Sequence, residues 1–274
     1  MKQARTYDQK HGIENPQPIR QGIPANGNQF ADDASEADNL EDVKPKKHTK
    51  KAKMKSTKGD DPIFTLMKPK QLCIFIGSSE QGKTHLMKYL LLNMCLRNQF
   101  DFGIVFTTTK FNHSYDFIKN QNLVIAGYDE KILKQYLKKL RSSDEPPPNF
   151  VIFDDCIGSL DTMSEFIQNF ASTFRHFNSS VFISLQYAYK VPPLFREQCN
   201  RCFMFKQNTK RSYEAIYDAY GLVFTDYKEF KATIDDITKE QFHCMYYLKE
   251  ETEPNKKYGE YKAPAEIPDV RLEF

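Results

Sequence analysis

Residues 77–84 carry glycine, lysine and threonine at a spacing that suits a phosphate chain. The segment reads GSSEQGKT, so Gly77 and Gly82 flank four residues, and Lys83 and Thr84 follow at once. Glycines let the backbone turn tightly and aim its amide groups at an anion, a lysine ammonium neutralises the β and γ phosphates, and a threonine hydroxyl is a ligand for Mg²⁺. We therefore predict a site for ATP and magnesium. The nucleotide-binding residues expected are Gly77, Ser78, Ser79, Glu80, Gln81, Gly82, Lys83 and Thr84.

A second set of reactive side chains ends the apolar segment VIFDDC, residues 151–156. A strand end beside a phosphate loop places Asp154 where its carboxylate can hold the magnesium ion with Thr84, and Asp155 where it can orient or deprotonate the attacking water. The alternative is that both acids only cap the helix that follows. Together with the phosphate loop, the acidic pair predicts hydrolysis of ATP.

Short apolar runs alternate with amphipathic segments from residue 61 onward, a pattern typical of a mostly parallel sheet covered by helices. Expected strands are 71–76, 102–108, 122–126, 150–154, 181–185 and 202–205, with a hairpin at 244–249 and 258–261. Expected helices are 83–96, 130–141 and 162–177, the last opening with a capping box of Thr162 and Glu165, and one or two more follow Thr209. The strand at 102–108 separates the two motifs and suggests an inserted strand between the motif strands, as in additional-strand, RecA-like ATPases. The predicted fold class is therefore α/β.

The first sixty residues have few large apolar side chains and many polar ones, so they cannot bury enough surface to offset the cost of chain ordering. Residues 1–43 are net acidic, whereas residues 44–58 contain eight lysines and no acid. The lysine run suits contact with DNA or RNA phosphates, nuclear import, or a solvated spacer. We expect a disordered tail at 1–60, acidic and then lysine-rich, and a P-loop ATPase domain at 61–274.

The 274-residue chain has 40% hydrophobic content, enough for one sizeable core. Its six cysteines have no regular spacing, which favours reduced thiols in an intracellular compartment. The most apolar stretch, residues 86–96, falls short of the roughly 20 residues that cross a bilayer, so no membrane partner is expected. Cys199 and Cys202 form one CxxC pair, and a zinc site that borrows His243 and Cys244 is the alternative to idle thiols.

Three segments in this order resemble the genome-packaging ATPases of poxviruses and related large DNA viruses, virophages and Polinton-like elements. They are GSSEQGKT at 77–84, VIFDD at 151–155 and STFRHFNSSVFISLQYAYKVPPLFREQCNRCFMFK at 172–206. That family is a branch of the FtsK/HerA superfamily of P-loop NTPases, and the resemblance covers most of residues 65–220. It implies a homo-oligomeric ring, with a hexamer expected, that hydrolyses ATP to push double-stranded DNA into a preformed capsid. Capsid proteins or a portal vertex would be its partners, at the site of virus assembly in the nucleus or cytoplasm of the host cell, or in the virion.

The resemblance also implies further site residues. Gln186, at the tip of a strand, is expected to contact the γ phosphate or the water, and a hydrogen-bonded glutamine without a catalytic role is the alternative. Arg175 and Arg196 are both candidates for the arginine that reaches the active site of a neighbouring subunit, and a surface ion pair is the alternative for each. His176 is expected to be structural. The family often has Glu where Asp155 stands, so a shorter side chain must reach the water here.

Two other functions remain open from the sequence. The same active site suits a helicase or a conjugation-type motor. A helicase accessory domain is the feature that distinguishes a helicase from a packaging motor. A nucleotide-binding assembly protein without significant turnover is the alternative that is not an enzyme. Because the net charge of residues 59–274 is close to zero, strong DNA binding requires lysines of several copies to gather at the pore of a ring.

Overall fold

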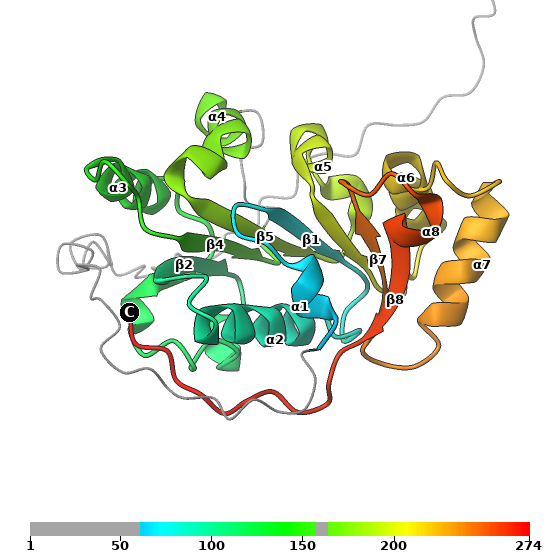
Figure 1. Ribbon diagram of the computed structural model, residues 1–274, viewed down its shortest axis with the longest axis horizontal. Helices are drawn as coiled ribbons and strands as arrows, with labels where there is room; N and C mark the ends of the chain where they lie inside the picture. The colour runs from blue at the N-terminus through cyan, green and yellow to red at the C-terminus, as the bar shows by residue number, and fades with distance from the viewer. Residues whose placement is uncertain (1–60, 157–163) are drawn as a thin grey trace, which may run out of the picture. The chain divides into compact units, whose positions relative to one another are not determined.

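The computed structural model describes residues 61–156 and 164–274, which form one sheet with helices on both faces (Figure 1). Eight strands of these residues lie in the order β3-β2-β4-β5-β1-β6-β7-β8. The strands are β1 (Leu72–Ile76), β2 (Phe102–Thr107), β3 (Val124–Ala126), β4 (Asn149–Asp154), β5 (Ser179–Leu185), β6 (Arg201–Met204), β7 (His243–Leu248) and β8 (Tyr258–Lys262). Neighbouring strands from β3 to β6 are parallel, and β6, β7 and β8 pair antiparallel. The predicted α/β fold with a mostly parallel sheet is therefore confirmed.

Helices cover both faces of this sheet, with α1 and α2 on one side and α3, α4 and α5 on the other (Figure 1). The α-helices are α1 (Ile63–Leu66), α2 (Lys83–Leu96), α3 (Glu130–Arg141), α4 (Glu165–Thr173), α5 (Pro193–Gln198), α6 (Lys210–Tyr220), α7 (Tyr227–Ile237) and α8 (Pro254–Lys257). Short 3₁₀ turns are η2 (Lys110–Asn112), η3 (Gln121–Leu123), η5 (Phe174–Phe177) and η6 (Ala188–Lys190). No helix of the described residues is long and apolar enough to cross a membrane.

The core lies along the central strands. Every residue of β1, β2, β4, β5 and β6 is buried, because helices cover both faces and leave no side of these strands to solvent. Stacked phenylalanines join neighbouring strands, and Phe75 lies 4.8 Å from Phe203 between ring centroids. By contrast, the outermost strand β8 has no buried residue. The strands that end in the sequence motifs are thus fully buried, whereas the antiparallel edge of the sheet is more exposed to solvent.

Most elements lie where the sequence predicts them. Helices α2 and α3 begin and end at the predicted residues, and β7 and β8 form the predicted hairpin. The predicted start of the helix at residue 162 is wrong, because α4 begins at Glu165 and the Ser164 side chain caps it by accepting a hydrogen bond from the Ile167 amide. The expectations for the tail 1–60 and for Thr162 fall on residues outside the described ones.

An inserted strand does lie between the two motif strands, but it is β5 and not the strand at 102–108. Strand β5 pairs with both β1 and β4, whereas β2 lies on the far side of β4. The chain order alone does not reveal this, because parallel strands joined by helical crossovers can be placed on either side of their predecessor.

One ion pair ties the antiparallel edge to the parallel core. Arg201 of β6 is 4% exposed, and its guanidinium bonds the Glu250 carboxylate and the Leu66 carbonyl oxygen. Partial burial acts to raise the pKa of Glu250, but the hydrogen bonds from Arg201 and Asn200 outweigh it and hold that pKa below its usual value. The pair therefore stabilises the folded state above the unfolded pKa of Glu250, and this contribution is lost as the pH falls through the lowered folded pKa.

We expect Glu250→Gln to lower the free energy of unfolding at pH 7 by about 1 kcal/mol, since the Arg201 cation would lose its charged partner while Glu250 itself is partly solvated. The difference from the wild type should vanish in acid, where Glu250 is protonated in both states. Urea unfolding between pH 3 and pH 8 measures this. Glu253→Gln, which breaks the exposed pair with Lys256, is the control and should change stability by less than about 0.5 kcal/mol. A pH-independent difference for Glu250→Gln would contradict the assignment.

Candidate active site

The predicted phosphate loop connects the carboxyl end of β1 to the amino end of α2, and its first two residues are anchored to neighbouring segments. The Gly77 amide donates to the Leu185 carbonyl oxygen at 3.2 Å, and the Ser78 amide donates to the Lys206 carbonyl oxygen at 2.9 Å. Gly82 has a φ of +101°, and a Cβ atom at this position would come within 2.6 Å of the Phe242 ring. Only glycine suits this conformation and this space, so the loop keeps an open turn at the start of α2.

Lys83 lies inside this loop and is 5% exposed. Its Nζ donates to the Ser78 carbonyl oxygen at 2.9 Å, which folds the side chain back over the loop. Burial lowers the pKa of Lys83, and the Asp155 and Asp154 carboxylates act in the opposite direction. A partly desolvated ammonium beside free helix amides favours an anionic ligand, so this loop has the chemistry to hold a phosphate chain.

Asp154 ends β4 and is 2% exposed. The Thr84 Oγ1 atom donates to its carboxylate, at 3.3 Å from Oδ1 and 3.4 Å from Oδ2. Burial raises the pKa of Asp154, and hydrogen bonds to the carboxylate, including those from Tyr115 and Thr84, act to lower it. A hydroxyl and a carboxylate this close form the all-oxygen donor set that Mg²⁺ prefers, so Thr84 and Asp154 fit a shared magnesium ion.

Asp155, Gln186 and Ser79 form a chain of hydrogen bonds between three elements. Gln186 Nε2 donates to Asp155 Oδ2 at 3.3 Å, and Ser79 Oγ donates to Gln186 Oε1 at 3.1 Å. The Asp155 backbone is left-handed, with a φ of 53°, and its amide donates to the Ser184 carbonyl oxygen at 3.0 Å. The structure therefore brings the predicted Gln186 and Asp155 into contact with the phosphate loop.

Tyr115 was missed by the sequence analysis. Its hydroxyl donates to Asp154 Oδ2 at 3.0 Å, and burial together with the Asp154 carboxylate raises the pKa of Tyr115 well above its usual value. The tyrosine therefore stays protonated and donates to the carboxylate over the whole physiological range. It lies in a connection after β2 without regular spacing, so no local signal distinguishes it from other buried aromatic residues.

The segment that carries Tyr115 is held by the C-terminal residues 263–274, shown in red below α2 in Figure 1. We call these residues the C-terminal strap. The Leu272 amide donates to the Phe117 carbonyl oxygen at 2.6 Å, and the Lys119 amide donates to the Leu272 carbonyl oxygen at 2.8 Å. At the start of the same strap, His85 Nε2 lies 2.7 Å from the Pro264 carbonyl oxygen. The strap thus contacts the residue next to Thr84 and the segment around Tyr115.

Arg175 and Arg196 lie away from the phosphate loop of their own chain. Arg175 is in η5, which precedes β5, and its guanidinium donates to the Gln198 side chain at 2.9 Å and to Asn200 Oδ1 at 3.0 Å. Arg196 is in α5, just before β6, and forms no ion pair or hydrogen bond through its side chain with the described residues. Both are therefore near the amino ends of parallel strands, opposite the edge where Gly77 follows β1. His176, also in η5, is exposed.

The CxxC pair does not form a metal site. Within residues 61–156 and 164–274, no group of three or more His, Cys, Asp or Glu side chains is placed to hold a metal ion. Cys199 and Cys202 are buried free thiols, and burial raises the pKa of Cys202 well above its usual value. Both thiols belong to the core, and the described residues do not bring them together with His243 and Cys244 as a metal site.

No protein-family model matches the chain. The sequence is 25% identical over 203 residues to the uncharacterized protein 075L of Invertebrate iridescent virus 6, covering 72% of this chain and 77% of that protein. The structure is similar to the genome packaging NTPase B204 of Sulfolobus turreted icosahedral virus 2 in complex with AMPPCP. The TM-score is 0.52 at 17% identity, covering 72% of this chain and 98% of that one. It is also similar to B204, the DNA-packaging ATPase of Sulfolobus turreted icosahedral virus, with a TM-score of 0.51 at 14% identity, over 72% and 98% of the two chains. This chain has the P-loop NTPase fold. The structural neighbours include viral genome-packaging ATPases, in line with the resemblance seen in the sequence.

We expect Tyr115→Phe to weaken binding of ATP with magnesium by about tenfold, because the Asp154 carboxylate loses a hydrogen bond to a charged group. Loss of that donor also raises the pKa of Asp154 further, so binding should fail at a higher pH than in the wild type. Fluorescence anisotropy of a labelled ATP between pH 5 and pH 8 measures both effects. Tyr136→Phe is the control, since Tyr136 is equally buried but bonds Asn149. Equal behaviour of the two variants would exclude a role of Tyr115 at the magnesium site.

Deletion of residues 271–274 should release the segment around Tyr115. The Lys119 amide would lose its acceptor, so we expect its hydrogen exchange to accelerate by about tenfold or more, with a loss of ATP affinity in the same direction as in Tyr115→Phe. Exchange measured by mass spectrometry on the wild type and on the deletion variant tests this. Phe274→Ala, which removes the ring contact with Phe150 but keeps Leu272 and its backbone hydrogen bonds, is the control. Unchanged exchange at residues 117–119 in the deletion would show that the strap does not hold this segment.

Proposed function

We propose that this protein is an ATP-driven double-stranded DNA translocase that packages a viral genome into a preformed capsid. The observation that carries the proposal is the hydrogen-bonded chain from Ser79 through Gln186 to Asp155, because it links a phosphate loop to an acid placed for hydrolysis. Two comparisons support the particular task. The fold is that of a packaging NTPase over almost the whole of that protein, and the sequence relative is a viral protein.

In the proposed reaction, residues 77–84 bind the phosphates of ATP, and Lys83 leaves the Ser78 carbonyl oxygen to contact them. Thr84 and Asp154 would hold magnesium, which supplies charge neutralisation on the β and γ phosphate oxygens. Tyr115 keeps the Asp154 carboxylate oriented toward Thr84. The buried position of Asp154 excludes competing water from this side of the site.

Asp155 is the residue that orients the attacking water or accepts its proton, and Gln186 holds the carboxylate in position. Gln186 also contacts Ser79 of the phosphate loop. Loss of the γ phosphate on hydrolysis would therefore affect Ser79 and Asp155, the two hydrogen-bond partners of the Gln186 side-chain amide. This geometry suits a residue that detects hydrolysis. Asp155 has a strained, left-handed backbone, as residues at functional sites often do, and its carboxylate reaches the Gln186 amide.

The proposal includes a homo-oligomeric ring, with a hexamer expected, in which an arginine of one subunit completes the site of the next. Arg196 fits this role better than Arg175, because the Arg175 guanidinium is engaged by Gln198 and Asn200 and stacks on Phe174 at 4.3 Å. Double-stranded DNA in the pore and a capsid or portal vertex are the proposed partners. The proposed place of action is the site of virus assembly in the host cell.

Double-stranded DNA should stimulate ATP hydrolysis by the full chain. Lys83→Ala should reduce turnover by about 100-fold or more, and Gln186→Ala should retain nucleotide binding but lose most of the stimulation. Lys68→Ala, an exposed lysine at the opposite end of β1, should leave both rates unchanged. Phosphate release with and without a long duplex measures these rates. Stimulation by single strands alone would indicate a helicase, and turnover at background level would indicate a nucleotide-binding assembly protein.

A further inference from the structure

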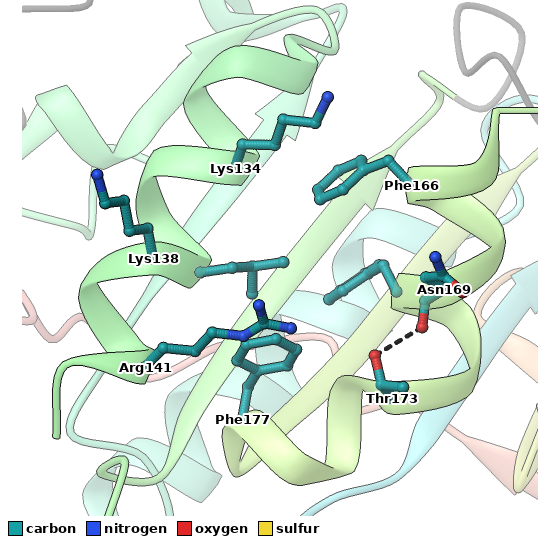
Figure 2. A pocket seen from close by; sticks show the side chains of 9 residues that line it. Lys134, Lys138, Arg141, Phe166, Asn169, Thr173 and Phe177 are labelled. Atoms are coloured by element: carbon teal, nitrogen blue, oxygen red, sulfur yellow. Dashed lines mark hydrogen bonds between the residues drawn. The ribbon is translucent and has the colours of Figure 1, made fainter. Parts of the chain in front are cut away.

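A cavity of about 370 Å³ lies between α3 and α4 and shares no residue with the active site. Figure 2 shows the side chains of α3 along one side, those of α4 along the other, and Phe177 of η5 at one end. The lining residues are Lys134, Leu137, Lys138, Arg141, Phe166, Asn169, Phe170, Thr173 and Phe177. We refer to this cavity as the α3–α4 groove.

The α3 side of the groove is a stripe of positive charge. Lys134, Lys138 and Arg141 follow one another at intervals of four and three residues, which places them on one face of the helix. Lys134 is partly neutralised by Glu130 at 2.6 Å, whereas neither Lys138 nor Arg141 forms an ion pair with the described residues. Among the residues that the structure describes, no acidic side chain lines the groove, so the positive charge of its lining favours an anionic occupant.

Apart from Asn169 and Thr173, the rest of the lining is apolar. Phe170 and Leu137 are buried, and the cations of α3 lie over the faces of the other two rings. Lys134 Nζ lies 4.9 Å from the centre of the Phe166 ring, and the Arg141 guanidinium lies 4.9 Å from that of Phe177. These ring faces are already covered, which leaves little room for stacking of nucleic acid bases. A chain that alternates carboxylates with apolar side chains matches the lining better.

This protein contains such a chain in its own tail. Residues 30–43 read FADDASEADNLEDV, with six acidic residues, no basic residue, and Phe30, Leu40 and Val43 among them. Seventeen residues separate Val43 from Asp61 and can span about 60 Å when extended. A domain of this size has a radius of gyration of about 17 Å, so the segment can reach the groove of its own chain or of an adjacent copy.

We infer that the α3–α4 groove is a docking site for the acidic segment 30–43 of this protein. The carboxylates pair with Lys138 and Arg141, and the apolar side chains contact Phe166, Phe170 and Leu137. Docking removes six acids from the neighbourhood of the lysine run 44–58, which leaves those lysines free to contact other anions. The inference does not depend on the proposed reaction.

Zero-length carbodiimide cross-linking of the full chain tests this directly, because it joins a carboxylate only to an ammonium in contact with it. Mass spectrometry should find acids of residues 30–43 joined to Lys138 and Lys134. We expect Arg141→Glu to reduce the yield of these cross-links severalfold, as loss of an exposed ion pair and a new repulsion predict. Lys139→Glu is the matched control, since it makes the same charge change on an exposed residue of α3 outside the groove. Cross-links from residues 30–43 only to the lysines of 44–58 would overturn the inference.

A second measurement distinguishes the acidic segment from nucleic acid. In a full chain whose six acids of residues 30–43 are replaced by Asn or Gln, a labelled 30–43 peptide should bind, and the double variant Lys138→Glu, Arg141→Glu should weaken it by about fivefold or more. The double variant Lys131→Glu, Lys139→Glu should not. The same variants are titrated with a labelled DNA duplex. Weaker duplex binding in the groove variant, with peptide binding unchanged, would assign the groove to nucleic acid and overturn the inference.

Discussion

Burial of the Asp154 carboxylate is the constraint around which the active site is built. A carboxylate removed from water loses several kcal/mol of solvation unless hydrogen bonds or a cation compensate it. Here Thr84 and Tyr115 supply those bonds from two distant parts of the chain. The compensation requires that α2 begin beside the end of β4 and that the connection after β2 return over the same edge. The strap 263–274 then holds that connection through Leu272, so the arrangement extends to the C-terminal residues.

The parallel sheet makes this arrangement possible. Strands β4, β5 and β1 are adjacent, and their register places Asp154 beside Ser184 and Ile76 beside Leu185. Three consecutive carboxyl ends therefore meet at one edge, and each continues into a functional segment. The hydrogen-bonded route from Ser79 to Gln186 to Asp155 crosses all three. A sheet in which β2 separated β1 from β4 would remove Gln186 from between the loop and the acid.

The sequence predicts the features of the fold that depend on neighbouring residues in the chain. Residues 77–84, Asp154, Asp155 and the bounds of α2 and α3 follow from spacing and periodicity within short windows. The position of β5 could not be predicted, because it depends on how crossovers pack and not on the residues of either motif strand. The contact of Tyr115 with Asp154 spans 39 residues and leaves no periodic trace. The start of α4 was misplaced because Thr162 and Glu165 match a capping box, whereas Ser164 supplies the cap.

Docking of residues 30–43 in the α3–α4 groove would explain why an acidic segment precedes the lysine run in the chain. Asp61, at the first described residue, accepts hydrogen bonds from Tyr89 at 2.9 Å and from Tyr261 at 2.6 Å. The lysine run 44–58 would then be tethered at both ends, by the groove and by Asp61. A segment held in this way keeps eight ammonium groups at high local concentration beside the domain, without any need for a basic surface on the domain itself. Because residues 59–274 have almost no net charge, such a tether provides the attraction to phosphates that their surface lacks.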